Sequence, residues 1–333
     1  MKKSRVKAKS SKRKSSKQRS SKQRSPKSRS SAPFKVGFLV SATQLYWGRY
    51  TGAFETELKA LGWNVGPNGN IQIDYQPPKG AAGNLQVINQ WATNFTTTYP
   101  VNVIVTAGFE AANACKQATS RQTNPTPVVF ASVGDPVGCN LVASIQNPGG
   151  NLIGCSNMQT DPAVMKNRVT VMQTKLQPTK VGVIGNNPVG NPVCPIDEAM
   201  DQALIALNNA NIPAAPKTLG QWSPSDFQSV QAVQSKLVAL KQTGVDVLLV
   251  CSDPVVSAKA DNLVQAAHGP GFSMRTMHEF KEHVDLHDGD QSYGPDFQDL
   301  FIQAANFVDQ ILRQKLKPSA LTVYQPTTYV TYP

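Results

Sequence analysis

Two aspartates in similar settings are the residues of this chain whose chemistry is easiest to name. Asp135 follows the apolar run 128–133, Asp253 follows the apolar run 245–251, and each aspartate directly precedes a proline. An ionised carboxylate in such a place can accept charge-assisted hydrogen bonds from an ammonium group. Aspartate is also a common cap for a helix that starts after a turn. The sequence leaves both roles, ligand binding and helix capping, open for each aspartate.

Further polar and aromatic side chains follow other runs of strand length. In parallel α/β sheets, ligands bind where the carboxyl ends of the strands lie. Hydroxyl and backbone N–H groups there suit an anion, and an aromatic ring can stack on a flat apolar group. A zwitterionic, aromatic small molecule would use all three kinds of contact, although Tyr46 and Trp47 could equally pack beneath the strands. The candidate ligand-binding residues, besides the two aspartates, are Ser41, Thr43, Tyr46, Trp47, Gly108, Phe109 and Asn186.

Elements of two kinds must position these residues, because apolar runs of strand length alternate with segments of helical period. This alternation favours parallel sheets that are covered by helices on both faces. The expected strands are 34–40, 71–75, 101–106, 128–133, 152–154, 180–184 and 245–251, and the expected helices are 48–61, 85–95, 163–176, 196–209 and 255–267.

An internal echo indicates two similar lobes. Lys35–Leu39 reads KVGFL and Lys180–Ile184 reads KVGVI, and each run is followed by a polar loop and then a helical segment. Two comparable βαβ lobes in one chain favour a ligand site between them.

Three blocks of the sequence carry a resemblance to a known family. The segment Pro127–Asn157, PVVFASVGDPVGCNLVASIQNPGGNLIGCSN, closely resembles the ABC-transporter substrate-binding proteins, in particular the branch that carries aromatic amino acids. The segment Ser292–Val330 and the strand that starts at Lys180 resemble the same family, so that the similarity extends over about residues 35–332. The resemblance implies an α/β fold with two Rossmann-like, doubly wound lobes, the type I periplasmic-binding-protein clamshell.

The resemblance also implies a division of the chain and a set of binding residues. Lobe 1 would contain residues 34–157 plus 280–312, and lobe 2 would contain residues 158–279 plus 313–333, with its final strand. The family's ligand-binding residues, carried over position by position, fall on Ser41, Gly108, Asp135, Asn186, Asp253 and Tyr293.

The expected function is the capture of a small, amino-acid-like and aromatic solute between two lobes by hinge closure. The family's partners would be the membrane permease and the ATPase subunits of an ABC transporter, and its location would be periplasmic. No cofactor is expected. The motifs of phosphate-binding loops and of the hydrolase nucleophile elbow are absent from the sequence, so we expect no catalytic residues and no enzyme.

The positive charge of the chain is concentrated at its beginning. Residues 1–31 hold 14 of the 33 Lys and Arg and no Asp or Glu, which leaves 33 − 14 = 19 basic against 21 acidic residues in the remainder. A tail of this composition, residues 1–33, cannot bury enough apolar surface to order itself, so we expect disorder.

The tail supports an alternative to the transport function. No apolar stretch of the kind found in signal peptides precedes Phe34, and no run of about 18 apolar residues indicates a membrane span. The alternative is a cytosolic ligand-sensing clamshell whose residues 1–31 contact nucleic acid or an anionic surface through counterion release. The tail could equally be a solvated extension without a partner.

Histidines and cysteines complete the candidates. His278 and His283 are one residue too far apart for the metal-binding H-E-x-x-H pattern, so a solvated polar loop is favoured over a metal site. The five cysteines are Cys115, Cys139, Cys155, Cys194 and Cys251, and they show no zinc or redox spacing. We expect most of them to be small core residues, with a Cys139–Cys155 disulfide conceivable but disfavoured.

Overall fold

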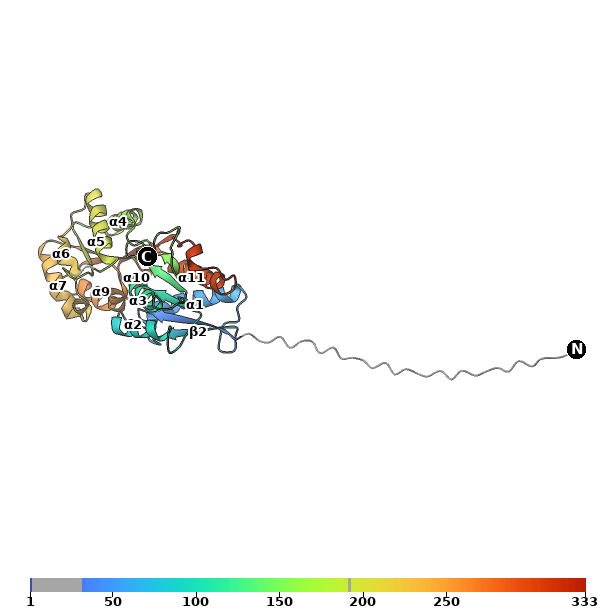
Figure 1. Ribbon diagram of the computed structural model, residues 1–333. Helices are drawn as coiled ribbons and strands as arrows, with labels where there is room; N and C mark the ends of the chain where they lie inside the picture. Colours follow the sequence, from blue (N-terminus) through green and yellow to red (C-terminus); the bar gives the residue numbers. More distant parts are fainter. Residues whose placement is uncertain (2–31, 191–192) are drawn as a thin grey trace. The chain divides into compact units, whose positions relative to one another are not determined.

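A computed structural model shows that residues 33–333 are built around two mainly parallel sheets (Figure 1). The structure describes residue 1 and residues 32–190 and 193–333, and for residues 44–46 it describes the backbone alone. The predicted disordered tail, residues 1–33, lies almost wholly outside the described residues.

The first sheet has the strand order β2-β1-β3-β4-β5, and all of its pairings are parallel. Its strands are β1 (Phe34–Val40), β2 (Ile71–Gln76), β3 (Val103–Ala107), β4 (Val128–Val133) and β5 (Leu152–Ser156). The helices that pack around it are α1 (Gln44–Ala60), α2 (Leu85–Asn94), α3 (Phe109–Thr119) and α11 (Phe297–Leu312).

The second sheet repeats this order, read as β7-β6-β8-β9-β10, and adds the antiparallel strand β11 at its edge. Its strands are β6 (Val181–Asn186), β7 (Gln221–Trp222), β8 (Val247–Cys251), β9 (Arg275–His278), β10 (Gln291–Pro295) and β11 (Tyr329–Tyr332). Its helices are α4 (Pro162–Leu176), α5 (Ile196–Asn209), α6 (Lys217–Gly220), α7 (Val230–Gln242), α8 (Pro254–Ala258), α9 (Ala260–His268) and α10 (Lys281–Asp285). Short 3₁₀ turns, η1 (Pro224–Phe227) and η2 (Pro318–Ala320), complete the elements.

Strand β8 shows why an almost continuous apolar run forms the centre of such a sheet. Its residues are all buried, and successive side chains belong to different cores. Val247 and Leu249 pack on the face covered by α4 and α5, whereas Leu248 and Val250 pack on the face covered by α7 and α9. Both faces are therefore covered, as in other parallel sheets, and the predicted α/β class with two Rossmann-like lobes is confirmed.

Along the described residues, the chain passes between the two lobes three times. The crossings lie between β5 and α4, between β10 and α11, and between η2 and β11. This differs in detail from the predicted division, since α10 and β10 lie with the second sheet although residues 280–312 were expected in lobe 1. The turn η2 contacts β5 of the first sheet, although residues 313–333 were expected in lobe 2.

Two predicted features of the helices need correction. The single helix expected at 255–267 is broken at Lys259, whose φ of −130° is not helical, into α8 and α9. Helix α3 was not expected at all, because its buried face is made of small residues such as Ala111 and Ala114 that give little apolar contrast. Within the described residues, no helix is long and apolar enough to cross a membrane.

The cysteines follow the prediction in part. Cys115, Cys155 and Cys251 are free and buried, as expected of small core residues. The conceivable Cys139–Cys155 bridge is not formed, because Cys155 lies inside β5 with its thiol 3.3 Å from the carbonyl oxygen of Leu300. Cys139 instead forms a disulfide with Cys194.

Candidate functional site

A cavity lies where the strand order reverses in both sheets. In the first sheet the reversal falls between β1 and β3, in the second between β6 and β8, and ligands of open α/β sheets bind at such points. The space in the cavity that a water-sized group can occupy is about 40 Å³, well below the range of about 300–1,000 Å³ for small-molecule sites, so the lobes must separate for a solute to enter. Its lining residues are Trp47, Gly108, Phe109, Glu110, Ser132, Val133, Gly134, Asn157, Gln159, Pro195, Ile196, Ser252, Asp253, Pro254, Ser257 and Phe280.

The two lobes touch each other around this cavity. A Cβ atom added to Gly83 would lie 2.8 Å from Cγ2 of Val255, and one added to Gly108 would lie 3.2 Å from Cγ of Pro254. Both glycines have positive φ, +75° and +87°, which favours glycine over other residues. Glycines in lobe 1 therefore allow α8 of lobe 2 to approach closely, and the conformation is a closed one.

Asp253 performs the capping role and also lines the cavity. Its Oδ1 atom accepts a 2.7 Å hydrogen bond from the backbone N–H of Val256, which caps α8, and its Oδ2 atom accepts a 2.7 Å bond from Nδ2 of Asn186. Burial raises the pKa of the Asp253 carboxyl, and these hydrogen bonds partly offset the rise. Asn186 does not line the cavity, but its hydrogen bond orients the Asp253 carboxylate.

Glu110 brings a second carboxyl group to the same cavity from the other lobe. It lies in the first turn of α3, and its Oε2 atom is buried with no hydrogen-bond partner among the described residues, although the residue as a whole is half-buried. Burial raises the pKa of Glu110, and the charge of Asp253 raises it further. One carboxyl from each lobe thus faces the enclosed space.

The cavity wall also offers unpaired polar atoms, both donors and acceptors, and apolar rings. Among the described residues, Nε1 of Trp47, Oγ of Ser252 and Oδ1 of Asn157 are buried without hydrogen-bond partners. Because burying an unpaired polar group costs free energy, these atoms are ready to pair with a ligand's polar groups. The rings of Trp47, Phe109 and Phe280 provide apolar walls beside them.

Two residues of the β5–α4 crossing, Asn157 and Gln159, line the cavity and make hydrogen bonds to other segments. Nε2 of Gln159 donates a 2.9 Å bond to the carbonyl oxygen of Ser252, which ties the β5–α4 crossing to lobe 2. Nδ2 of Asn157 donates a 2.8 Å bond to Oε1 of Glu279. Burial raises the pKa of Glu279 to about 7, although the nearby Arg168 guanidinium and Asn157 lower it. A buried carboxyl with a raised pKa therefore stands next to Asn157, a residue of the cavity wall.

Of the predicted site residues, Trp47, Gly108, Phe109 and Asp253 line this cavity, and Asn186 bonds to one of them. Ser41 is buried, and its hydroxyl donates to the carbonyl oxygen of Ala107, which joins the ends of β1 and β3. Thr43 stands at the N-terminus of α1 without a side-chain capping bond. The side chain of Tyr46 lies outside the described residues.

Asp135 and Tyr293 do not line the cavity. Oδ1 of Asp135 accepts a 2.7 Å bond from the backbone N–H of Gly138, so this carboxylate forms a turn, and it lines a separate hollow. The ring of Tyr293 stacks 5.7 Å from that of Tyr329, and its carbonyl oxygen accepts a 2.9 Å bond from Nε of Arg168. A ligand role for these two residues stays a prediction.

Several lining residues were missed from the sequence. Glu110 follows Gly108 and Phe109 directly, and an acid in the first turn of an unrecognised helix was its signal. Gln159 and Phe280 lie in segments that join elements rather than in loops after predicted strands, so a rule based on strand ends could not find them.

The histidine segment is not the solvated polar loop that was predicted. His278 lies in β9 and His283 in α10, and both are fully buried. Their Nδ1 atoms are 2.9 Å apart, and Nε2 of His283 lies 3.3 Å from Oγ of Ser257. Burial lowers the pKa of each to about 3, so both rings are neutral at pH 7. No group of three or more His, Cys, Asp or Glu among the described residues could hold a metal ion.

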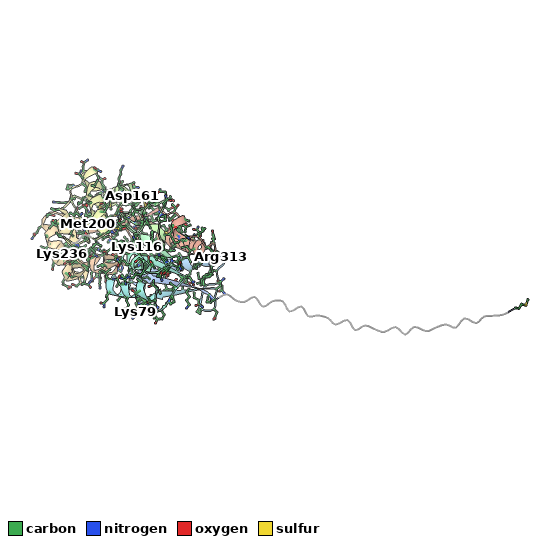
Figure 2. The ribbon with its side chains drawn as sticks, viewed as in Figure 1. Lys79, Lys116, Asp161, Met200, Lys236 and Arg313 are labelled. Atoms are coloured by element: carbon green, nitrogen blue, oxygen red, sulfur yellow. A yellow bond between two sulfur atoms is a disulfide. The ribbon has the colours of Figure 1, made fainter. Side chains whose placement is uncertain are left out.

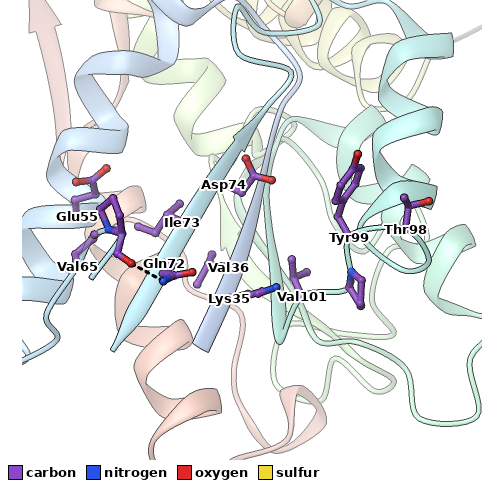
Figure 3. A pocket seen from close by; sticks show the side chains of 13 residues that line it. Lys35, Val36, Glu55, Val65, Gln72, Ile73, Asp74, Thr98, Tyr99 and Val101 are labelled. Carbon is purple, nitrogen blue, oxygen red and sulfur yellow. Dashed lines mark hydrogen bonds between the residues drawn. The ribbon is translucent and has the colours of Figure 1, made fainter. Parts of the chain in front are cut away.

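A larger hollow lies elsewhere on the first lobe, at the N-terminal halves of β1 and β2 (Figure 3). It measures about 1310 Å³ including the solvent at its mouth, and Nε2 of Gln72 in its wall donates a 2.7 Å bond to the carbonyl oxygen of Pro67. It lies at the opposite strand ends from the cavity and receives no residue from lobe 2. Its larger volume alone does not make this hollow a better candidate for the ligand site than the cavity between the lobes.

The fold and the cavity define a two-lobed α/β protein of the class that encloses small molecules between its lobes. Residues 48–321 match the family model described as ABC transporter substrate binding protein. The chain belongs to this family, as its resemblance implied.

The chain is also similar to proteins of known sequence or structure. The chain is 26% identical over 192 residues to a tyrosine-binding protein of Clostridioides difficile, a match that covers 58% of this chain and about half, 51%, of that relative's length. A conserved domain protein of Vibrio cholerae shares the fold with a TM-score of 0.72, at 23% identity and 90% coverage of each chain. A Streptococcus pneumoniae ABC domain in complex with L-Trp has a TM-score of 0.70, at 18% identity and 90% coverage of each chain.

Proposed function

We propose that this protein captures a small amino-acid-like solute with an aromatic side chain and delivers it to the membrane permease of an ABC importer. The observation that carries the proposal is the meeting of one carboxyl from each lobe, Glu110 and Asp253, in a closed cavity with aromatic walls. Two acceptors of this kind suit an ammonium group, which pairs best with ionised oxygens. The tyrosine-binding relative and the fold neighbour in complex with L-Trp support the same solute class.

Each part of such a solute has a matching part of the cavity. The ammonium group would lie between the two carboxylates, and the flat side chain would lie against Trp47, Phe109 or Phe280. The solute carboxylate would accept from Nε1 of Trp47, Oγ of Ser252 or the free N–H groups at the start of α3. Because these groups come from both lobes, the solute favours the closed state, and closure is the motion by which it is captured.

Transport further requires a location outside the cytosol, as is normal for the family. The Cys139–Cys194 disulfide supports such a location, since disulfides persist mainly in oxidising compartments. The solute-loaded closed form would dock on the permease, and a separate ATPase subunit would drive import.

The first test is calorimetry with L-tyrosine and L-tryptophan on the wild-type chain and on Asp253→Asn. Asparagine keeps the helix-capping ability and the approximate shape of aspartate but removes its charge. We expect the variant to lose about 2–5 kcal/mol of affinity, the cost of truncating one partner of a buried charge pair.

Asp161→Asn is the matched control. Asp161 caps α4 through bonds to the N–H groups of Ala163 and Val164 and does not line the cavity, so its variant should bind like the wild type. Wild-type protein that gives no heat with either amino acid would overturn the solute class. Binding that survives in Asp253→Asn within a few-fold would show that Asp253 serves α8 alone.

A further inference from the structure

The disulfide joins parts of the chain that belong to different lobes. Cys139 lies in the segment that follows β4 of the first sheet, and Cys194 lies between β6 and α5 of the second lobe. The two Cα atoms are 5.8 Å apart although 55 residues separate them along the chain. Between them the chain crosses from one lobe to the other at the β5–α4 connection. The bond is therefore a covalent link between lobes in addition to the chain crossings.

Cys139 is held firmly on lobe 1. Its backbone N–H donates a 3.1 Å bond to the carbonyl oxygen of Asp135. The carbonyl oxygen of the next residue, Asn140, accepts a hydrogen bond from the ammonium group of Lys116 on α3, a residue that Figure 2 labels. Leu141 is buried in the core of the first lobe. This segment must move with lobe 1.

Cys194 is held on lobe 2 in a similar way. The backbone N–H of Val193 donates a 2.8 Å bond to Oδ1 of Asn187, which follows β6 directly. Nδ2 of Asn187 donates to Oδ1 of Asp197 at 2.8 Å and lies 3.7 Å from the sulfur of Met200 on α5. The Cys194 segment must therefore move with α5 and lobe 2.

The disulfide also lies beside the cavity. Pro195 lines the cavity, as does Gly134, and a Cβ added to Gly134 would lie 2.5 Å from Cγ of Pro195. Both cysteines are half-buried rather than enclosed, so a small thiol can approach the bond. A disulfide at this place therefore joins the two lobes directly beside the cavity.

We propose that the Cys139–Cys194 disulfide is a redox-controlled lobe tether, which limits how far the cleft opens and so slows the exit of a bound solute. An intact disulfide keeps the two Cα atoms within about 7 Å of each other. Opening of a clamshell rotates rigid lobes about a hinge and would carry these two segments apart. The oxidised chain thus opens less widely than the reduced chain.

The chemistry of the switch is thiol–disulfide exchange with a dithiol reductant. A thiolate of the reductant attacks one sulfur of the tether, so that a mixed disulfide forms and the other cysteine leaves as a thiolate that takes up a proton. The second thiol of the reductant then attacks the mixed disulfide and releases the remaining cysteine. The tether gains two electrons and two protons, and the reductant ends as a disulfide.

The test compares the full chain with and without dithiothreitol by small-angle X-ray scattering and by hydrogen exchange, with no solute present. We expect reduction to increase the radius of gyration of the protein and to speed exchange about tenfold or more in cavity segments such as 107–111 and 252–257. Exchange in the lobe cores should stay unchanged. The double variant Cys139→Ser/Cys194→Ser should behave as open with and without the reductant.

Three outcomes would overturn the proposal. Five titratable thiols in denatured protein kept free of reductant would show that the bond does not form. An unchanged radius and unchanged cavity exchange after reduction would place the bond on the hinge axis, where it restrains nothing. A uniform rise of exchange across both lobes would make it a stabilising crosslink without a role in opening. Because no solute takes part, these results do not depend on the proposed function.

Discussion

At the residue scale, Asp253 combines two tasks that the sequence left as alternatives. One carboxylate oxygen caps α8, and the other accepts from Asn186 at the cavity. A rule based on strand ends could therefore predict Asp253 and Gly108 as cavity residues, because both follow central strands at the reversal of strand order. The same rule selected Asp135, which follows β4 away from the reversal point and accepts a bond within a turn, so that its ligand role stays a prediction.

Glu110 gives the solute site a defined pH dependence. Burial, helped by the charge of Asp253, raises the pKa of Glu110 to about 8, so this carboxyl is protonated in the empty cavity at neutral pH. An ammonium group favours the ionised carboxylate, and its binding must therefore release a proton. We expect the affinity for L-tyrosine to rise with pH between about 6 and 8, by up to about tenfold per unit.

Calorimetry in two buffers of different ionisation enthalpy measures that proton release directly. Glu110→Gln should bind with less proton release and a flatter pH profile, while its Tm stays close to that of the wild type at low pH. A pH profile that is as steep in Glu110→Gln as in the wild type would assign the proton to another group.

The pH dependence of stability should have the opposite sign. The folded chain keeps a proton on Glu110 that the unfolded chain loses near the ordinary carboxyl pKa of 4.5, so this group weakens folding as pH rises from about 4.5 through about 8. His278 and His283, whose pKa values burial lowers to about 3, act the other way and weaken folding as pH falls below about 6.5. Comparison of Glu110→Gln with the wild type by denaturant unfolding isolates the first effect.

At the element scale, the strands were predictable because they are short apolar runs buried on both faces. The spans of β1 and β4 agree with the predicted ranges, 34–40 and 128–133. Strand β10 was not predicted, since Gln291–Pro295 carries no apolar run and is specified by its pairing with β9 and β11. Tertiary pairing, which a local pattern does not contain, placed it in the second sheet.

Two glycines provide a matched test of packing within elements. A Cβ on Gly154 in β5 would lie 2.0 Å from the carbonyl oxygen of Phe130, so we expect Gly154→Ala to destabilise the protein by about 1–3 kcal/mol or more. Gly52 lies on the exposed side of α1 with nothing within 4 Å of its added Cβ. Gly52→Ala should therefore stabilise by about 0.5–1 kcal/mol through helix propensity.

Urea unfolding of the two variants, followed by circular dichroism, checks both signs. A Gly154→Ala protein as stable as the wild type would mean that β4 and β5 can separate at no cost, contrary to their buried pairing.

At the scale of the whole molecule, the similarity between the runs at Lys35 and Lys180 correctly predicted two lobes of the same kind. The runs that begin at Lys35 and Lys180 lead into β1 and β6, which hold the same position in two sheets of the same strand order. The lobe boundaries were harder to foresee, because the chain returns to lobe 1 for α11 after β10 and only then enters β11. The partner of Cys139 was equally hidden, since it depends on how the lobes face each other.

The concentration of charge in residues 1–31 leads to a prediction about the full chain. Residues 33–333 form a compact unit that contains the whole cavity, so a chain that starts at residue 32 should bind L-tyrosine with an affinity within about twofold of the full chain. The full chain should also bind heparin or anionic vesicles with an affinity that falls steeply with salt, and the shortened chain should not.

Salt-independent binding, or equal binding by both chains, would remove any electrostatic role from this segment. Cell fractionation distinguishes the two functions. Protein found outside the cytosol fits transport, and protein found with the nucleoid fits the ligand-sensing alternative.

The C-terminal strand has a consequence for solubility. Strand β11 pairs with the outer edge of β10 in antiparallel register, from Ser292 with Tyr332 to Pro295 with Tyr329, and so occupies backbone groups that would otherwise face water. Bare sheet edges are templates on which other molecules add strands and form aggregates. Strand β11 thus replaces β10 as the edge of the sheet, and its four residues make this edge short, which leaves little length on which another strand can pair.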